Sequence, residues 1–547
     1  MERKYAGEHP GSGIQSLKSA TTGLDPFTGD WGSGLTNLYH LLRRTSFGVS
    51  QADVDALSPL SVPDAVELLL TVPASAPNPP LNNYNASYND PTGVLPGQTW
   101  STAAYGDGTV NAYRITSYKA WWLGLMLGES LSIVEKMTLF WHNHFATETG
   151  IVGDARYCYK QNALLRQFAL GNFKDLTKQV TIDPAMLRYL NGYANTKTAP
   201  DENYGRELQE LFTVGKGPAS MYTEDDVKAA ARVLTGWRDN STLISSYFNP
   251  NAHDTTDKQF SSFYNNTLII GKTGTDGATE VDDLLTMIFA QDEVAKFICR
   301  KIYRWFVYYT IDQTIEDNII TPLAAIFRSN NYEIRPVLAT LLKSAHFFDP
   351  LNIGCMIKSP IDFCSELCRQ YNVQFPSSNN FAVQYSAWDY IRSYGSTLGM
   401  NIGDPPNVAG WPSYYQVPEF YELWINSDTL PLRNQFSDVF ISTNGRQVGG
   451  FKLKIDPFAF VQRISNPFDP NALVAGLAQL ILAIALTSDQ LTFLKGVLLP
   501  GLPDYEWTNE WTNYVSNPTD PTSLATVQNR LQVLIKTIMD FAEYQLA

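Results

Sequence analysis

The sequence predicts a mainly α protein: a large multi-helix globular body with loop-rich and short-strand insertions. Apolar residues recur at helical spacing over most of the 547 residues. Helix-start signals precede several of these stretches, as at Asp183-Pro184 and at Thr223, which Asp226 follows three residues later. The chain is 44% apolar and 17% charged, which is enough apolar material for a substantial core.

We expect two parts along the chain, an N-terminal arm rich in Gly, Ser and Thr at residues 1–37 and a single mainly helical domain at residues 38–547. Within the domain, composition and periodicity change in four places: a long loop at 73–112, an irregular short-strand insertion at 240–275, a loop-rich segment at 375–455 and C-terminal helices at 471–545.

Charge and hydropathy exclude several classes of partner. The net charge of -14 argues against nucleic acid and against an anionic membrane surface, because both need clustered Lys and Arg. The longest apolar run, residues 472–486, contains Gln479 and is shorter than the ~20 residues that span a bilayer, so we expect no membrane-spanning segment. The first ten residues have no apolar core typical of a signal peptide, which leaves a cytoplasmic location open.

Two histidines lie in EKMTLFWHNHF at residues 135–145. At helical spacing His144 falls within an apolar face, and His142 falls on the opposite side near Glu135 and Thr138. In an unbroken helix the two imidazoles cannot therefore bind one ion together. Either histidine is then a buried structural residue, or it is a ligand that needs partners from elsewhere in the chain.

A second polar pattern lies at residues 203–212, NYGRELQELF. Asn203, Glu207 and Glu210 form a polar stripe beside a buried apolar one, and Glu207 is the carboxylate nearest the core. Burying a carboxylate is costly unless a cation, a metal or a proton compensates it. The stripe is thus either a metal or acid/base site, or a surface paired by Arg206.

His253-Asp254, in the irregular insertion, is either a ligand pair or a polar turn. Imidazoles and carboxylates from separate segments would together suit a divalent transition ion such as Zn, Mn or Fe. In this hypothesis the ligands are His142 or His144, with Glu207 and His253. Asp254 would be a further ligand or would orient His253, and Glu210 would be the acid/base group acting on a metal-bound water.

Ordered motifs along the chain resemble the bacterial family called domain of unknown function 1800. They are LLRRTSFG (41–48), EKMTLFWHNHF (135–145), QN (161–162), DPAML (183–187), NYGRELQELFT (203–213), YTEDDV (222–227), LTGW (234–237), HD (253–254), KSP (358–360) and PNVAGWP (406–412). The resemblance runs from about Leu38 to the C-terminus, although Gln209 stands where many members carry Met. It implies an envelope or extracellular protein, often encoded beside sulfatase-like proteins, and it adds weight to the residues within its motifs.

Two functions follow as hypotheses. The first is a metal-dependent enzyme of the cell envelope or exterior, a hydrolase or oxidoreductase acting on a glycan or another exported polymer. The alternative is a non-catalytic extracellular structural, assembly or binding protein, in which the polar cluster is a structural network that holds helices together.

Overall fold

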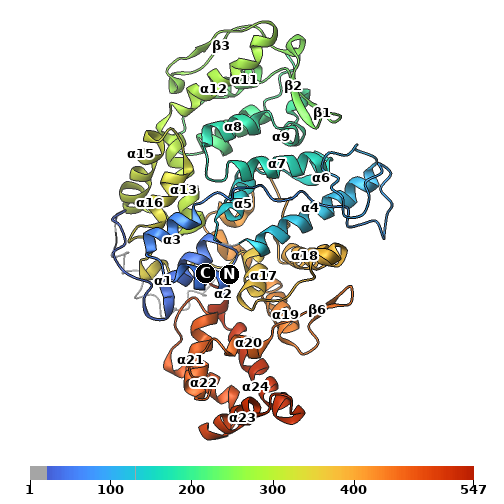
Figure 1. The fold of residues 1–547 in the computed structure, drawn as a ribbon. Coiled ribbons are helices and arrows are strands. Elements are labelled where there is room, and N and C mark those ends of the chain that lie inside the picture. Colours follow the sequence, from blue (N-terminus) through green and yellow to red (C-terminus); the bar gives the residue numbers. More distant parts are fainter. Residues whose placement is uncertain (1–20, 22, 130) are drawn as a thin grey trace, which may run out of the picture.

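The predicted class is confirmed. The computed structural model describes residue 21, residues 23–129 and residues 131–547, and helices dominate throughout (Figure 1). Strands in these residues form three two-stranded antiparallel pairs, β1–β2, β3–β4 and β5–β6. Buried residues from Trp31 to Tyr544 belong to one hydrophobic cluster, so helices from the whole described length share a core.

The helices of the first half are α1 (Thr36–Thr45), α2 (Gln51–Leu57), α3 (Val62–Leu69), α4 (Gly108–Gly128), α5 (Val134–His144), α6 (Thr149–Val152), α7 (Ala155–Gln167), α8 (Phe173–Thr181), α9 (Pro184–Tyr189), α10 (Asn203–Glu207) and α11 (Glu224–Val233). Those of the second half are α12 (Glu280–Phe289), α13 (Asp292–Phe306), α14 (Gln313–Ile315), α15 (Thr321–Ser329), α16 (Ile334–Leu342), α17 (Pro360–Gln370), α18 (Phe381–Thr397), α19 (Thr429–Ile441), α20 (Pro457–Val461), α21 (Pro470–Ile481), α22 (Ser488–Leu498), α23 (Asp504–Ser516) and α24 (Pro521–Met539). The strands are β1 (Trp237–Asn240), β2 (Ser245–Phe248), β3 (Lys258–Gln259), β4 (Leu268–Ile269), β5 (Arg446–Val448) and β6 (Phe451–Leu453).

Both predicted helix starts are present. The Asp183 carboxylate accepts the backbone N–H groups of Ala185 and Met186 at the start of α9. Thr223 and Asp226 form the reciprocal capping box that opens α11. Each cap satisfies N–H groups that a helix start otherwise leaves unpaired, so these two boundaries are determined locally.

The sequence predicts that residues 375–455 are rich in loops, but the structure contains more helix in this segment than expected. It contains α18 and α19 in addition to the β5–β6 pair. The buried face of α18 consists of only Tyr385, Ala387, Ile391 and Gly395, which is too sparse to give a clear helical period. Its register is set instead by tertiary packing along α4 (Figure 1).

The other segments that the sequence distinguishes by composition lie at the edges of the molecule. They are the described part of the N-terminal arm, the 73–112 loop, the 240–275 insertion and the C-terminal helices. The expected loop ends at Asp107, whose side chain caps α4 by accepting the N–H of Val110. The short-strand insertion lies with α11 and α12 at one end of the molecule, and α20–α24 form the opposite end (Figure 1). Residues 1–20 and 22 of the expected arm lie outside the described residues, and farther along it the Phe27 ring stacks on Phe348. No helix in the described ranges has both the length and the apolar character needed to cross a bilayer.

Candidate functional site

The two predicted histidines lie on one unbroken helix, α5, and are buried in different surroundings. His144 Nε2 donates to the carbonyl of Phe212 at 3.0 Å, and its Nδ1 accepts from Lys301 Nζ at 2.9 Å. The His142 ring packs edge-on against Trp122, and its Nε2 has no partner in the described structure. Burial lowers the pKa of both imidazoles, to about 4 for His142, so both are neutral at pH 7.

Glu207 is the last residue of α10, and a π-helix (Leu208–Thr213) follows it directly. One carboxylate oxygen of Glu207 is buried and has no partner in the described residues. Burial, and then the negative charge of Glu210, raises the pKa of Glu207. Glu210 itself forms an ion pair with the exposed Lys216. Glu210 is thus partly exposed and held by Lys216, and no contact between Glu210 and an imidazole is found among the described residues.

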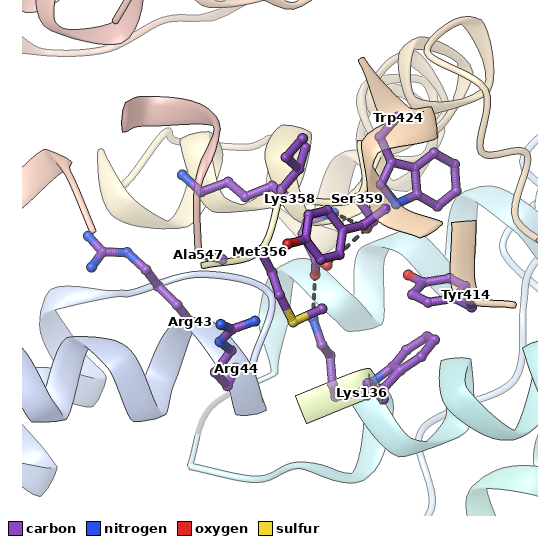
Figure 2. A pocket seen from close by; sticks show the side chains of 13 residues that line it. Arg43, Arg44, Lys136, Met356, Lys358, Ser359, Tyr414, Trp424 and Ala547 are labelled. Atoms are coloured by element: carbon purple, nitrogen blue, oxygen red, sulfur yellow. Dashed lines mark hydrogen bonds and ion pairs between the residues drawn. The ribbon is translucent and has the colours of Figure 1, made fainter. Parts of the chain in front are cut away.

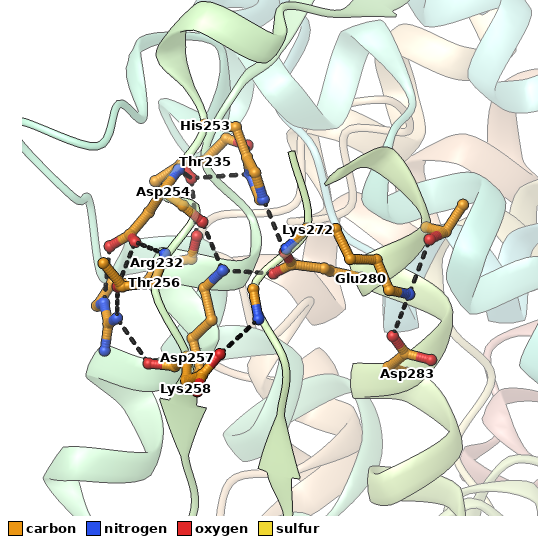
Figure 3. A network of polar contacts seen from close by, with 12 residues as sticks. Arg232, Thr235, His253, Asp254, Thr256, Asp257, Lys258, Lys272, Glu280 and Asp283 are labelled. Atoms are coloured by element: carbon orange, nitrogen blue, oxygen red, sulfur yellow. Dashed lines mark hydrogen bonds and ion pairs between the residues drawn. The ribbon is translucent and has the colours of Figure 1, made fainter. Parts of the chain in front are cut away.

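His253 belongs to a polar network in which both of its ring nitrogens have hydrogen-bond partners (Figure 3). Its Nε2 lies 3.0 Å from Glu280 Oε1, and its Nδ1 lies 2.9 Å from the carbonyl of Thr235. The second oxygen of Glu280 accepts from Lys258 Nζ at 2.5 Å. All three charged or titratable side chains are at most 1% exposed. The network joins the short-strand insertion to the start of α12, as a structural staple would.

Asp254 points away from this histidine. Its carboxylate accepts from Arg232 Nε at 2.8 Å and from Thr256. Burial alone would raise the pKa of Asp254, but these hydrogen bonds outweigh burial and lower it to about 2. Thr235 and Glu280, not Asp254, therefore orient His253.

The structure does not gather the expected metal ligands at one point. His144 and His253 have both ring nitrogens engaged, and each has a different set of neighbours. Within the described ranges no group of three or more His, Cys, Asp or Glu side chains is placed to hold a metal ion. The predicted convergence of His142, His144, Glu207 and His253 is thus not found among the described residues. A bound transition ion remains a prediction, for which these residues supply no set of ligands.

A different cluster does converge. Four cations line one cavity with a volume of about 30 Å³ (Figure 2). We call it the cationic cavity; its walls are Arg43, Arg44, Lys136, Trp305, Met356, Ile357, Lys358, Ser359, Asp362, Tyr414, Tyr421, Trp424 and Ala547. Asp362 is the one acidic side chain among these wall residues. The space exceeds that needed for one water and suits a group of a few heavy atoms.

Helix ends place these cations. Arg43 and Arg44 lie in the last turn of α1, where the helix dipole favours positive charge. Lys136 lies in the first turns of α5, and Lys358 directly precedes Ser359, the residue that caps α17 by accepting the N–H of Asp362. The four side chains come from three segments far apart in sequence, so only the tertiary fold brings them together.

Two carboxylates neutralise part of this charge. Glu366 is shared, with Oε1 3.2 Å from Arg43 Nε and Oε2 3.0 Å from Lys358 Nζ. Asp362 pairs with Lys136 at 2.5 Å. Arg44 has no carboxylate partner in the described structure; it donates to the carbonyl of Asn352, and its buried Nε–H is unpaired. Arg44 is therefore the cation of this cavity that has no carboxylate side chain as a partner in the described structure.

A second small cavity adjoins the first, and Trp305 and Tyr414 line both. We call it the lysine cavity; its walls are Phe140, Asn143, His144, Lys301, Arg304, Trp305, Ala409, Tyr414 and Tyr415. No wall residue of the lysine cavity is acidic, and neither Lys301 nor Arg304 has a carboxylate partner among the described residues. Burial, and then Arg304, lowers the pKa of Lys301 to about 7.

Unpaired buried cations are costly, and so are buried N–H groups that lack acceptors. Among the described residues, the adjoining cavities hold one buried cation without a carboxylate, Arg44, and two partly exposed ones, Lys301 and Arg304. They also hold two orphan N–H groups, Arg44 Nε and Trp305 Nε1. A negatively charged group with several acceptor oxygens would satisfy both deficits at once.

The sequence alone assigns no role to these cations. A usable signal was present, because two consecutive arginines follow Leu41-Leu42 on a helix whose last eight residues are all buried. Arginines in such a position need acceptors from elsewhere. Lys301 carried no comparable signal, since its lack of an acid partner depends on the surroundings of α13.

Comparison with known proteins gives one result. Residues 40–546 match the model of the family described as "Protein of unknown function (DUF1800)". The chain belongs to the DUF1800 family. No curated protein and no solved structure matches it. Three segments that carry the resemblance to DUF1800, residues 41–48, 135–145 and 358–360, supply all four cations of the cationic cavity.

Proposed function

We propose that this DUF1800 protein is a binding protein of the cell envelope or exterior, which holds an anionic group of a glycan or another exported polymer. The group is a sulfate, phosphate or carboxylate, seated in the cationic cavity and reaching toward the lysine cavity. One observation carries the proposal: an acidic chain of net charge -14 collects buried cations around a cavity, and among the described residues Arg44, Lys301 and Arg304 have no carboxylate partner.

The chemistry of the walls supports an oxyanion in particular. Arg44 offers a guanidinium, whose planar fork of donors matches two oxygens of one group. Trp305 lines both cavities, and its indole N–H has no partner in the described structure. Tyr414 and Trp424 supply aromatic surfaces, against which the carbon skeleton of a polymer unit would pack.

The cavity volume of about 30 Å³ supports recognition of a substituent, and the rest of the polymer would lie outside. Electrostatic selection then depends on the charged substituent and less on the sugar or backbone that bears it. The metal-dependent hydrolase or oxidoreductase remains a separate hypothesis, and elemental analysis of protein purified without a chelator tests it directly.

The test is isothermal titration with matched oligosaccharides that differ only in carrying or lacking sulfate groups. We expect the sulfated form to bind and the unsulfated form to bind at least about tenfold more weakly through this site, since charge-assisted hydrogen bonds contribute about 1.5–3 kcal/mol each. Arg44→Gln should remove most of that preference. Lys452→Gln, at an exposed lysine of β6, is the matched control and should keep it. Equal affinity for both forms, or equal behaviour of the two variants, would contradict the proposal.

A further inference from the structure

A third hollow lies at the other end of α17, with a volume of about 340 Å³. We call it the tryptophan groove. Its walls are Ser50, Ala52, Gly124, Leu127, Gly128, Glu129, Cys368, Arg369, Asn372, Val373, Phe375, Gln384 and Trp388. It shares no wall residue with the cationic cavity, and its volume lies in the range of pockets that enclose a small organic ligand.

Two wall residues of the tryptophan groove, Arg369 and Glu129, have side chains that ordinarily carry a charge. The Arg369 guanidinium donates to Asp53 at 2.7 Å and to the carbonyls of Gly48, Leu127 and Glu129, so every nitrogen is engaged. Glu129 differs from Arg369 in that its pKa is shifted. Burial, and then the negative charge of Glu135, raises the pKa of Glu129 well above its ordinary value. The groove therefore presents a carboxyl group with a raised pKa, and its one wall cation, Arg369, is paired.

Some polar groups of the wall residues have no partner in the described structure. Glu129 Oε1 accepts the N–H of Glu135, and its buried Oε2 has no partner in the described structure. Gln384 uses its amide nitrogen on the carbonyl of Pro376, which leaves its oxygen as an acceptor. Asn372 is exposed, and its side-chain amide has no partner among the described residues. Together they supply both donors and acceptors, spread around one hollow.

An aromatic surface completes the groove. Trp388 is partly exposed on α18, and its indole lies directly over Gly124 of α4. A Cβ at position 124 would lie 2.6 Å from the indole ring, so only glycine permits this placement. Phe375, also partly exposed, is a second ring on the wall. A flat apolar ring bordered by neutral donors and acceptors matches a pyranose, which has an apolar C–H face and a rim of hydroxyl groups.

We infer that the tryptophan groove is a second binding site, for a neutral saccharide unit that stacks on Trp388 and hydrogen-bonds to Glu129, Asn372 and Gln384. The site does not depend on the cationic cavity, because the two share no residue and recognise different chemistry. In a protein that binds an acidic polymer elsewhere, it would add recognition of uncharged sugar units.

The experiment titrates the full chain with cellotetraose, maltotetraose and chitotetraose. We expect at least one of these neutral oligosaccharides to bind. Trp388→Ala should weaken that binding by at least about tenfold, and Trp388→Phe, which keeps a ring, by less than about threefold. Phe493→Ala removes an aromatic side chain that is 56% exposed on α22, and this control should leave binding unchanged.

Two further variants keep the inference testable if Trp388→Ala does not fold. Asn372→Ala removes an exposed amide without touching the core, and we expect a loss of at least about threefold. Glu129→Ala removes a carboxyl group that is expected to hydrogen-bond the sugar, and we expect a loss of at least about threefold. Absence of binding by the whole panel at about 10 mM, or equal binding by the Trp388→Ala and Phe493→Ala variants, overturns the inference. Arg44→Gln should leave neutral-sugar binding intact, so failure of the two proposals can be told apart.

Discussion

Lys301 Nζ lies 2.9 Å from Nδ1 of His144 and makes no ion pair with a carboxylate in the described structure. Because His144 Nε2 donates to the carbonyl of Phe212, its Nδ1 is an acceptor and Lys301 is the donor. The groups facing the amine are His144 on α5, the Leu211 carbonyl, and Phe297 and Arg304 on α13. Burial, and then the positive charge of Arg304, lowers the pKa of Lys301 to about 7, and none of these groups is negatively charged to oppose that shift.

Anion binding should therefore depend on pH. An anion in the adjoining cavities favours charged Lys301 and raises its pKa, so binding takes up a proton wherever the free amine is neutral. Affinity should be constant below pH 7 and should fall above it, by at most about tenfold per pH unit. Titration calorimetry at about pH 6 and about pH 8.5, in buffers of different ionisation enthalpy, measures both the slope and the proton uptake.

Lys301→Met is the matched variant, because it keeps the length of the side chain and removes the titrating amine. It should bind the anion more weakly at low pH and lose most of the slope above pH 7. An unchanged slope in this variant would assign the pH dependence to another group.

The two neighbouring arginines of α1 should differ in their effects. Arg43→Gln leaves Glu366 with Lys358 as its remaining cation, and breaking a buried ion pair costs about 3 kcal/mol of the free energy of unfolding. Arg44→Gln breaks no ion pair within the described part of the chain, so it should cost less stability and more anion affinity. Urea unfolding and calorimetry on both variants test this order, and a larger loss of stability in Arg44→Gln would contradict it.

The network of Glu280, His253 and Lys258 should behave as a structural staple. Glu280→Gln leaves the fully buried Lys258 without its carboxylate, so we expect a loss of about 3–5 kcal/mol in urea unfolding. Asp283→Asn breaks the half-exposed pair with Lys272 in the same region and should cost less than about 1 kcal/mol. Similar losses in both variants would remove the special role of the buried network.

His142 should make stability sensitive to acid. Its folded pKa of about 4 lies below the ordinary value of 6.5, so the unfolded chain binds the proton more readily. Its contribution to stability is complete above pH 6.5, is lost as the pH falls, and is fully lost below about pH 4. The loss is on the order of 3 kcal/mol.

His142→Phe keeps a ring between Trp122 and Trp411 and removes the titrating group. Unfolding free energies at about pH 7 and about pH 4.5 should therefore differ less in the variant than in the parent chain. If the two proteins lose equal stability between these pH values, His142 is not the responsible group.

The sequence allowed the mainly α class and the starts of α9 and α11 to be predicted, because caps and periodicity are local. It also placed His142 and His144 on opposite sides of a helix. It could not place α18, whose helical register depends on α4, nor show that Glu280 would pair with His253 from 27 residues away. The cations of the cationic cavity come from residues 43–358, and such convergence has no local signature.

The most direct measurement is a crystal structure of the protein grown with selenate, a tetrahedral oxyanion whose selenium is located by anomalous scattering. We predict a selenium peak in the cationic cavity, with selenate oxygens within about 3 Å of the Arg44 guanidinium. The peak should be absent from crystals of Arg44→Gln grown in the same solution. Selenium peaks only at surface lysines, with the cationic cavity filled by water alone, would contradict the proposed function.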